Sequence, residues 1–396
     1  MTSDRINMNK KLFGIDLDVF LLGLVSFFTD VSSEMIFSVF SIFFTVILGA
    51  SVFLLGILEG LADLASTSLD YISGFISDKT GKRKKYAFAG YFLSAIGKLI
   101  MVFTTTLSAV FSFRIIDRLG KSIRGSPRDA WLSSIAEKSK RGYSFGIHQT
   151  LDQAGAIVGP LLAYAILSYF GQTSATFSLL FKLAFIPAII GLGILLMVKD
   201  RPSIPKRKEK FFSSYKRFGK ELKHYISTAG IFSLAYFSFG FLLLKAYLVG
   251  FAIKDVILIY ALFNFSAFIF SIPVGKIGDY LGRKKIILAS YIIYFILSIG
   301  FIIASTKIFI IFLFVLFGLF YAIDESQTKA YISDLEKSRR ATAIGVYSFI
   351  TGLIYLFASL IAGLLWKINP SYAFIYAATI SLITILFFIT GRRKFK

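Results

Sequence analysis

Cysteine is absent from this 396-residue chain, so disulfide bonds and thiol chemistry are excluded, while the redox compartment stays undetermined. A glycine-rich loop of the form G-x-x-x-x-G-K-S/T is also absent, which argues against a nucleotide-driven pump. No nucleophile–base pair and no cluster of metal ligands stands out, so we expect no enzymatic activity, no metal and no cofactor. Polar residues are too few for a soluble globular protein, because 56% of the residues are hydrophobic and the mean hydropathy is +0.74.

Repeated apolar stretches of about 20 residues indicate an all-α membrane protein. We predict twelve transmembrane helices in two pseudo-symmetric six-helix bundles. The first six spans are 17–46, 52–76, 86–105, 108–134, 143–170 and 176–198. The second six are 224–250, 255–277, 286–304, 307–333, 341–366 and 371–391. The predicted domains are an N-terminal bundle, a basic cytoplasmic linker and a C-terminal bundle, over 1–198, 199–223 and 224–396.

The net charge of +22 raises nucleic acid as an alternative partner, but the positive residues lie in particular loops. The basic segments are 77–85, 137–141, the linker, 283–285, 337–340 and the final GRRKFK. Alternate loops have no Lys or Arg, or only one. By the positive-inside rule, both termini of this multi-pass protein are cytoplasmic, and we expect it in the plasma membrane. The expected partner is therefore the lipid bilayer, and no nucleic acid.

A short motif occurs twice and suggests that the chain arose by duplication. The first copy, SGFISDKTGKRKK, contains Gly74, Asp78 and Gly81 and ends in a basic cluster. Each of these residues recurs 201 positions later, in VGKIGDYLGRKK, as Gly275, Asp279 and Gly282. A second pair of similar segments, 130–146 and 330–345, follows the fourth helix of each half. Direct repeats of this kind predict two halves packed around a central cavity.

The repeated motif resembles the loop 2–3 motif of the major facilitator superfamily, G-x-L-a-D-r-x-G-r-k, and the resemblance spans essentially the whole chain. It implies a secondary active transporter that works by alternating access, and we expect a monomer. In the family, the aspartate and the loop arginine, here Asp78 and Arg83, latch the cytoplasmic side. The remaining residues that we assign to this gating motif are Arg124, Arg128 and, in the second half, Arg283.

Ionisable side chains within the membrane are costly unless they are paired or face water, so each is a functional candidate. Asp30 and Glu34 lie four residues apart on the first helix, and Glu59 and Asp63 lie four apart on the second. Counted from the cytoplasmic ends, these four carboxylates form two layers, and we assign them to proton coupling. We expect Asp30 and Asp63 to share a proton in one state and to separate in the other.

Basic residues on the fourth helix supply the opposite charge at the same depth. The candidates for substrate binding or charge compensation are Arg114, Arg118, Lys121 and, on the fifth helix, Asp152. The alternative is an ion-pair network that only holds the first half together. Lys98, in the middle of the third helix, is buried without an evident reason, whereas a lone His148 is typical of a hydrogen-bonded structural residue.

The fifth helix bears on the direction of transport. The antiporter motif of drug–proton exchangers is G, eight residues, G, three residues, G-P, two residues, G-G. The matching residues are Gly146, Gly155, Gly159 and Pro160, but Ala163-Tyr164 replace the final pair. The alternative explanation is close helix packing and a bend. We therefore predict proton-coupled export of small organic molecules or drugs. Uptake of a sugar, organic acid or amino acid stays open, as does a non-transporting receptor or passive pore on this fold.

Overall fold

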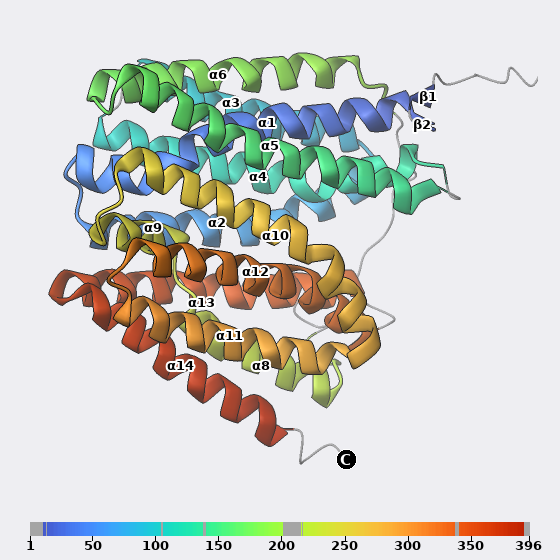
Figure 1. Ribbon diagram of the computed structural model, residues 1–396. Coiled ribbons are helices and arrows are strands. Elements are labelled where there is room, and N and C mark those ends of the chain that lie inside the picture. Colours follow the sequence, from blue (N-terminus) through green and yellow to red (C-terminus); the bar gives the residue numbers. More distant parts are fainter. Residues whose placement is uncertain are drawn as a thin grey trace, which may run out of the picture.

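The computed structural model describes residues 11–12, 14–103, 106–137, 140–200, 215, 217–336 and 340–391. Two short strands, β1 (Lys11–Leu12) and β2 (Ile15–Asp16), form an antiparallel hairpin before the first helix. The helices that follow run side by side along one direction, with the first half, blue to green, packed on the second half, yellow to red (Figure 1).

Each half contributes six membrane-crossing segments. The first half contains α1 (Leu17–Ile42), extended by a π-helical turn, η1 (Phe43–Ile47), and then α2 (Val52–Thr80), α3 (Arg83–Phe103), α4 (Leu107–Ile135), α5 (Arg141–Phe170) and α6 (Ser174–Met197). The second half contains α8 (Lys220–Ala235), α9 (Phe239–Leu248), α10 (Ile253–Leu281), α11 (Arg283–Ile303), α12 (Lys307–Leu335), α13 (Arg340–Ile368) and α14 (Pro370–Gly391). The predicted fold class of twelve spans in two six-helix bundles is confirmed, with α8 and α9 together forming the seventh span.

Hydropathy alone finds eleven of these spans among the described residues. The twelfth, α4, is 29 residues long but carries the charged residues Arg114, Asp117, Arg118, Lys121, Arg124, Arg128 and Asp129. Helices of this composition are stable in a bilayer only when their charges face protein or a water-filled cavity. α4 is accordingly packed between α2 and α3.

The seventh span differs from the continuous helix predicted over 224–250. Helix α8 ends at Ala235, Tyr236 is its C-cap, and α9 begins after Ser238, whose hydroxyl accepts a hydrogen bond from the backbone N–H of Gly240 at 3.2 Å. Serine is favoured at this position because its side-chain oxygen accepts a hydrogen bond from an N–H group that has no partner within the helix. The break directs an aromatic cluster toward the centre of the molecule, where the rings of Tyr236 and Phe239 line the central cavity.

The ends of several helices are set by capping residues at their N-termini and by glycine at their C-termini. Ser51 and Thr106 cap α2 and α4, each accepting a hydrogen bond from the backbone N–H three residues later. At the other end of α2, Gly81 adopts a φ of 71°, a left-handed conformation that ends the helix and that glycine adopts without strain. The repeated glycine Gly282 likewise has a φ of 88° between α10 and α11. The motif thus produces the same helix–turn–helix in both halves.

The two ends of the bundle differ in charge. We call the end with the turn at Gly81, the α4–α5 connection and the turn at Gly282 the basic end, and the opposite end the far end. The halves meet along α2 and α13 and along α5 and α10. Gly56 allows the first contact, since a Cβ there would lie 2.4 Å from the carbonyl oxygen of Ser359. At the far end, the backbone N–H of Lys254 donates to the Gln172 side chain at 3.3 Å.

Candidate functional site

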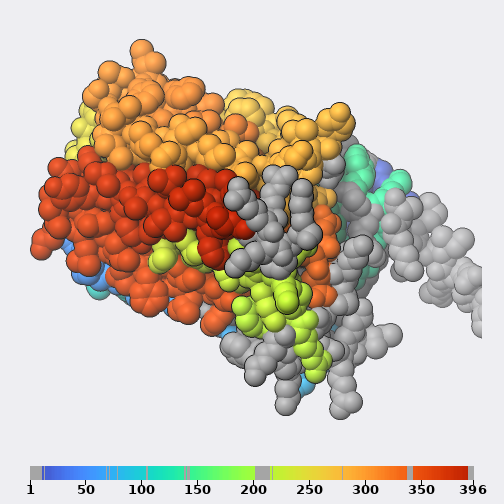
Figure 2. Space-filling view, turned by 90° about the horizontal axis from the view of Figure 1, so that it is seen from below, coloured from blue at the N-terminus to red at the C-terminus, as the bar shows by residue number. Residues whose placement is uncertain are grey.

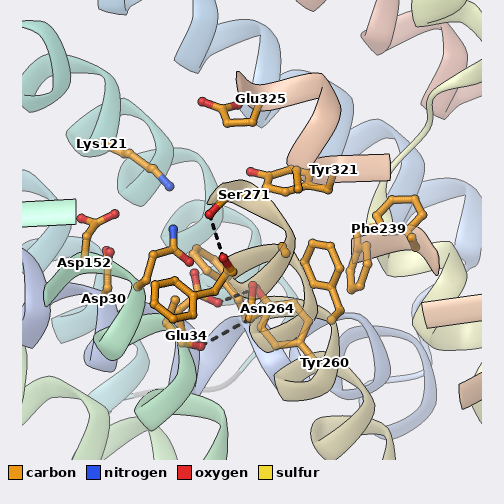
Figure 3. A pocket seen from close by; sticks show the side chains of 18 of the residues that line it. Asp30, Glu34, Lys121, Asp152, Phe239, Tyr260, Asn264, Ser271, Tyr321 and Glu325 are labelled. Carbon is orange, nitrogen blue, oxygen red and sulfur yellow. Dashed lines mark hydrogen bonds between the residues drawn. The ribbon is translucent and has the colours of Figure 1, made fainter. Parts of the chain in front are cut away.

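A cavity of about 770 Å³ lies between the two halves and is lined by helices of both (Figure 3). It contains all four carboxylates assigned to proton coupling, together with Arg114, Arg118, Lys121 and Asp152. The wall formed by the first half is charged, whereas that of the second half is mainly aromatic and contains one acidic residue, Glu325. A cavity of this size accommodates a drug-sized molecule.

Glu59 and Arg114 form a two-pronged ion pair deep in the charged wall. Arg114 Nε donates to Glu59 Oε1 at 2.7 Å, and Nη2 donates to Oε2. The guanidinium group also lies 4.4 Å from the centre of the Phe37 ring, and both charged side chains are buried. Such a pair compensates both charges and fixes α2 against α4. The N–H at Nη1 of Arg114 has no hydrogen-bond partner in the described part of the chain.

Asp63 and Arg118 form the next ion pair, one turn nearer the basic end. The distance from Arg118 Nε to Asp63 Oδ1 is 3.8 Å, and the guanidinium group lies 5.3 Å from the Phe37 ring centre. Both side chains are partly exposed to the cavity. Arg118 is thus level with Asp63, as the sequence indicated.

Asp30 lies beside Asp152 of α5 (Figure 3), and a proton shared by Asp30 and Asp63 in another state stays a prediction. The two carboxyl groups are close enough to repel each other electrostatically. Neighbouring carboxyl groups relieve such repulsion by sharing a proton. Arg128 approaches from α4, with Nη1 at 3.7 Å from Asp152 Oδ1 and at 2.9 Å from Ser26 Oγ. The Asp30–Asp152 pair is thus the candidate proton site at the side of the cavity.

The glycines of α5 explain how Asp30 and Asp152 come so close. A Cβ at Gly155 would lie 2.5 Å from the carbonyl oxygen of Phe27, and one at Gly159 would lie 2.9 Å from Glu34 Cβ. Both glycines therefore allow α5 to pack directly on α1. Close helix packing is the alternative explanation for the antiporter-like motif of this helix. Gly146 differs, because nothing lies within 4 Å of the Cβ position there and the residue lines the cavity. Pro160 lies inside α5.

Glu34 connects the charged wall to the opposite half. The hydroxyl group of Tyr260, on α10, donates a hydrogen bond to Glu34 Oε2 (Figure 3). One turn further along α10, Asn264 Nδ2 donates to the Ala156 carbonyl oxygen at 3.4 Å. Sequence reasoning missed both α10 residues, since neither is charged. Tyr260 and Asn264 are four residues apart and so lie on one face of an otherwise apolar helix. This spacing is the signal by which the sequence could have identified them.

Aromatic side chains form the wall contributed by the second half. The rings of Phe239, Tyr260, Phe263 and Phe317 contact one another, with centroid separations of 4.6 Å for Phe239–Phe263 and 5.4 Å for Phe263–Phe317. Tyr321 and Tyr236 extend this wall toward the centre. Aromatic faces of this kind bind apolar groups and also attract cations through their π electrons.

Lys121 is the one cavity-lining lysine in the described part of the chain, and its ammonium group points into the cavity near Asp30 and Asp152 (Figure 3). It forms no ion pair with a described residue, although it interacts electrostatically with Asp30, Glu34 and Asp152. Lys121 therefore stays available to pair with a group that changes its charge.

Lys98 lies outside the cavity, in a buried cluster between α1, α3 and α4. Its Nζ donates to Ser33 Oγ at 2.9 Å and lies 3.9 Å from Asp117 Oδ1, while Ser94 donates to the same carboxylate oxygen. The Lys98 side chain is fully buried. These contacts explain the mid-helix lysine as one partner of an internal ion pair. His148 similarly has a structural partner, Ser26 Oγ, at 3.2 Å.

The residues of the gating motif lie at the basic end, and their described contacts stay within each half. Arg83 Nη1 donates to the Ala130 carbonyl oxygen at 2.9 Å, and the Arg124 guanidinium lies 4.6 Å from the Tyr91 ring centre. In the second half, Arg283 Nε donates to Asp334 Oδ2 at 2.6 Å. Gly74 packs near Ser126, while the Cβ position of Gly275 has nothing within 4 Å. The side chains of Asp78 and Asp279 lie outside the described part, so the latch of Asp78 with Arg124 or Arg128 stays a prediction.

Asp70 is a polar residue near this motif that the sequence did not single out. Its Oδ1 accepts hydrogen bonds from both the backbone N–H and the hydroxyl of Ser126, each at 3.0 Å. One turn away, Ser73 donates to the Ser122 carbonyl oxygen at 3.1 Å. Side chains of α2 thus satisfy backbone groups of α4 beside Pro127, where a helix is weakened. In the sequence, the proline inside this helix was the signal that could have pointed to a contact of this kind.

Lys329 of α12 lies within electrostatic range of Asp70 and Asp129 of the first half. Its ammonium group pairs with Glu325, one turn earlier on the same helix. Lys329 and Asp129 occupy equivalent positions of the two repeats, so opposite charges interact across the pseudo-symmetry axis at the basic end.

Comparisons with known proteins agree with this architecture. The family model of the Major Facilitator Superfamily matches residues 22–256 and 226–396. An uncharacterized MFS-type transporter of Methanocaldococcus jannaschii is 37% identical over 374 residues, covering 93% of both chains. Multidrug resistance protein 2 of Bacillus subtilis is 24% identical over 317 residues, covering 76% of this chain and 77% of its own.

Among solved structures, a nucleoside transporter superposes with a TM-score of 0.78 at 13% identity, covering 94% of this chain and 99% of its own. A peptide transporter in complex with alafosfalin superposes with a TM-score of 0.70 at 12% identity, covering 96% and 95%. These likenesses show the fold. Together with the family match, they establish that the chain belongs to the major facilitator superfamily of membrane transporters, as its repeated motif predicted.

Proposed function

We propose that this protein is a proton-coupled secondary active transporter that exports amphipathic organic cations from the cytoplasm. It works as a monomer in the plasma membrane, with both termini cytoplasmic. The observation that carries this proposal is the composition of the central cavity, in which uncompensated carboxyl groups face a wall of aromatic rings.

The charge in the cavity favours a cationic substrate. Four of its acidic residues are compensated by a basic partner: Glu59 by Arg114, Asp63 by Arg118, Asp152 by Arg128 and Glu325 by Lys329. Asp30 and Glu34 have no ion pair with a described residue, and Lys121 is the positive charge between them. The cavity therefore has an excess of negative charge when no proton is bound, and a cation neutralises it.

The aromatic wall favours an apolar body on the same molecule. An ammonium or phosphonium group bound near Asp30 and Glu34 would place its apolar substituents against Phe239, Phe263 and Phe317. Binding of this kind combines charge attraction with contact to aromatic faces. Low-identity relatives named as multidrug resistance proteins support such a substrate class.

The same charge balance explains coupling to protons. A proton shared by Asp30 and Asp152 and a substrate cation both neutralise the same negative charge, so the binding of one opposes the binding of the other. Mutual exclusion of two ligands at one site is what an antiporter requires. Import of a proton then releases the cation on the outside.

A competition experiment tests this proposal. We expect the affinity of the purified protein for tetraphenylphosphonium to fall as the pH falls, by up to about tenfold per pH unit where one proton competes with one cation. Equilibrium binding measured across a pH series gives this slope. Asp30→Asn should flatten it, whereas Lys182→Met, at an exposed lysine outside the cavity, should leave it unchanged. An unchanged slope in Asp30→Asn would place the proton elsewhere.

The topology is tested separately by cysteine labelling, because the chain has no cysteine of its own. A single cysteine at exposed Lys79, at the basic end, should react with a membrane-impermeant maleimide only after the cells are opened. A cysteine at Gln172, at the far end, should react in intact cells. The reverse pattern would invert the proposed orientation and turn an exporter into an importer.

A second candidate function is uptake of an organic acid or amino acid. It is favoured by the buried N–H at Nη1 of Arg114 that has no hydrogen-bond partner in the described part of the chain, since a carboxylate would satisfy it. Binding of an organic anion that competes with tetraphenylphosphonium and depends on Arg114 would support this alternative.

A further inference from the structure

A second cavity of about 340 Å³ lies at the basic end of the second half, where α11 begins and α14 ends. Its walls are basic and apolar. The residues that line it are Leu281, Gly282, Arg283, Lys284, Lys285, Leu288, Tyr331, Asp334, Phe388 and Ile389. On this face of the molecule, α11 in orange runs beside α14 in red (Figure 2). The central cavity and its substrate do not involve these residues.

Two positive charges in this cavity are left uncompensated. Arg283 is neutralised by Asp334, with Nε at 2.6 Å from Oδ2. Lys284 and Lys285 form no ion pair with any residue in the described ranges, and Lys284 Nζ lies 5.9 Å from the centre of the Phe388 ring. Two adjacent ammonium groups repel each other and attract an anion. The chemistry of the cavity is therefore that of an anion site with apolar sides.

The first half provides an internal comparison. Lys84, which precedes Lys285 by the 201 positions of the repeat, donates to the carbonyl oxygens of Leu196 at 3.2 Å and of Val198 at 2.5 Å. Its ammonium group thus caps the end of α6, the last helix of that half. In the second half, the equivalent lysine lines the cavity beside α14 instead. The lysine therefore caps a helix in the first half, whereas Lys285 in the second half faces the cavity.

The apolar side of the cavity continues into the membrane-facing surface. Leu281 and Ile389, on its rim, are 45% and 43% exposed. Exposed apolar side chains then follow along both helices, including Ile292 and Ile296 on α11 and Leu386 on α14. In a membrane protein such a surface contacts lipid acyl chains. The anion site therefore lies where this exposed apolar surface of α11 and α14 reaches the basic end.

We propose that this cavity binds an anionic phospholipid, with the headgroup phosphate at Lys284 and Lys285 and the acyl chains along the exposed apolar surface of α11 and α14. Basic cavities between transmembrane helices at the cytoplasmic side suit such headgroups. Tyr331 supplies a phenol hydroxyl beside the same cavity. A soluble phosphate would use the lysines alone and would gain nothing from Leu281, Leu288 and Ile389.

The test is a lipid titration of the purified full-length protein, followed by native mass spectrometry. The parent protein should retain one dioleoylphosphatidylglycerol more strongly than dioleoylphosphatidylcholine. The double variant Lys284→Ala/Lys285→Ala should bind phosphatidylglycerol roughly 30-fold more weakly, because each lysine at a membrane surface contributes about 1 kcal/mol. The matched double variant Lys220→Ala/Lys276→Ala removes two exposed lysines at the same end that do not line the cavity, and should change binding by less than about twofold.

Two further arms separate the lipid from a free anion. Ile389→Ser should weaken phosphatidylglycerol binding while leaving any binding of inorganic phosphate unchanged. Equal binding of both lipids, or equal losses in the two double variants, would overturn the proposal. Displacement of phosphatidylglycerol by millimolar inorganic phosphate, with no effect of Ile389→Ser, would assign the cavity to a soluble anion instead. A melting temperature close to that of the parent protein shows that each variant is folded.

Discussion

Asp30→Asn should abolish pH-driven transport while leaving substrate exchange measurable. In the proposed mechanism Asp30 and Asp152 share one proton beside the central cavity, and an amide at position 30 cannot gain or lose that proton. We expect a loss of roughly 100-fold in gradient-driven transport, within the range of free-energy coupling between two sites. Proteoliposomes with an imposed pH gradient measure it directly, and counterflow in the same vesicles shows that the carrier still binds its substrate.

Asp63→Asn provides the matched control, because this carboxylate lies in the same cavity but is paired with Arg118. We expect weaker substrate binding and preserved coupling. If both variants still concentrate substrate when pH is the one driving force, the carboxylates serve structure and the proton pathway must be sought at His148 and its surroundings. If Asp63→Asn alone uncouples transport, the assignment of the proton to the Asp30–Asp152 pair is wrong.

Lys98→Met should be the most destabilising single change outside the cavity. It leaves Asp117 buried without the ammonium group that lies 3.9 Å from its Oδ1. Removal of one partner from a buried ion pair costs about 3–5 kcal/mol, whereas replacement of both by apolar side chains is often neutral. We therefore expect a marked drop in the melting temperature in detergent for Lys98→Met and a substantial recovery in Lys98→Met/Asp117→Leu.

The control for Lys98 is Lys182→Met, which removes an exposed lysine of α6 and should change the free energy of unfolding by less than about 0.5 kcal/mol. Transport by the double variant separates stability from function. If Lys98→Met/Asp117→Leu is stable but inactive, the cluster has a part in transport that the cavity geometry does not reveal. A fully stable Lys98→Met single variant would contradict the buried ion pair itself.

The fold followed from the sequence because its signals are local and repeated. Apolar stretches of membrane length located the spans, and the Gly81 and Gly282 turns marked equivalent positions in both halves. Helix α4 was found despite its charges because the repeat demanded a fourth helix. The break between α8 and α9 escaped notice, because Ser238 is a weak cap signal inside an otherwise continuous apolar run.

The candidate cavity residues were predictable in identity but not in pairing. Depth along each helix placed Asp30, Glu34, Glu59 and Asp63 correctly near the centre, and all four line the cavity. Which arginine or carboxylate each one meets depends on how the helices rotate about their axes. That rotation is set by close approach at Gly155 and Gly159, which brings Asp152 of α5 to Asp30 of α1. An uncharged partner such as Tyr260 gives a weaker signal than a charged one, namely its spacing of four residues from Asn264.

The exchange of a proton for a cation is tested most directly in proteoliposomes that contain a pH-sensitive dye. Addition of a tetraphenylphosphonium gradient to vesicles with the parent protein, at zero membrane potential, should drive protons in the opposite direction. Proteoliposomes with Asp30→Asn should show cation exchange without this proton flux. Movement of the cation in the parent protein with no accompanying change in internal pH would contradict the account.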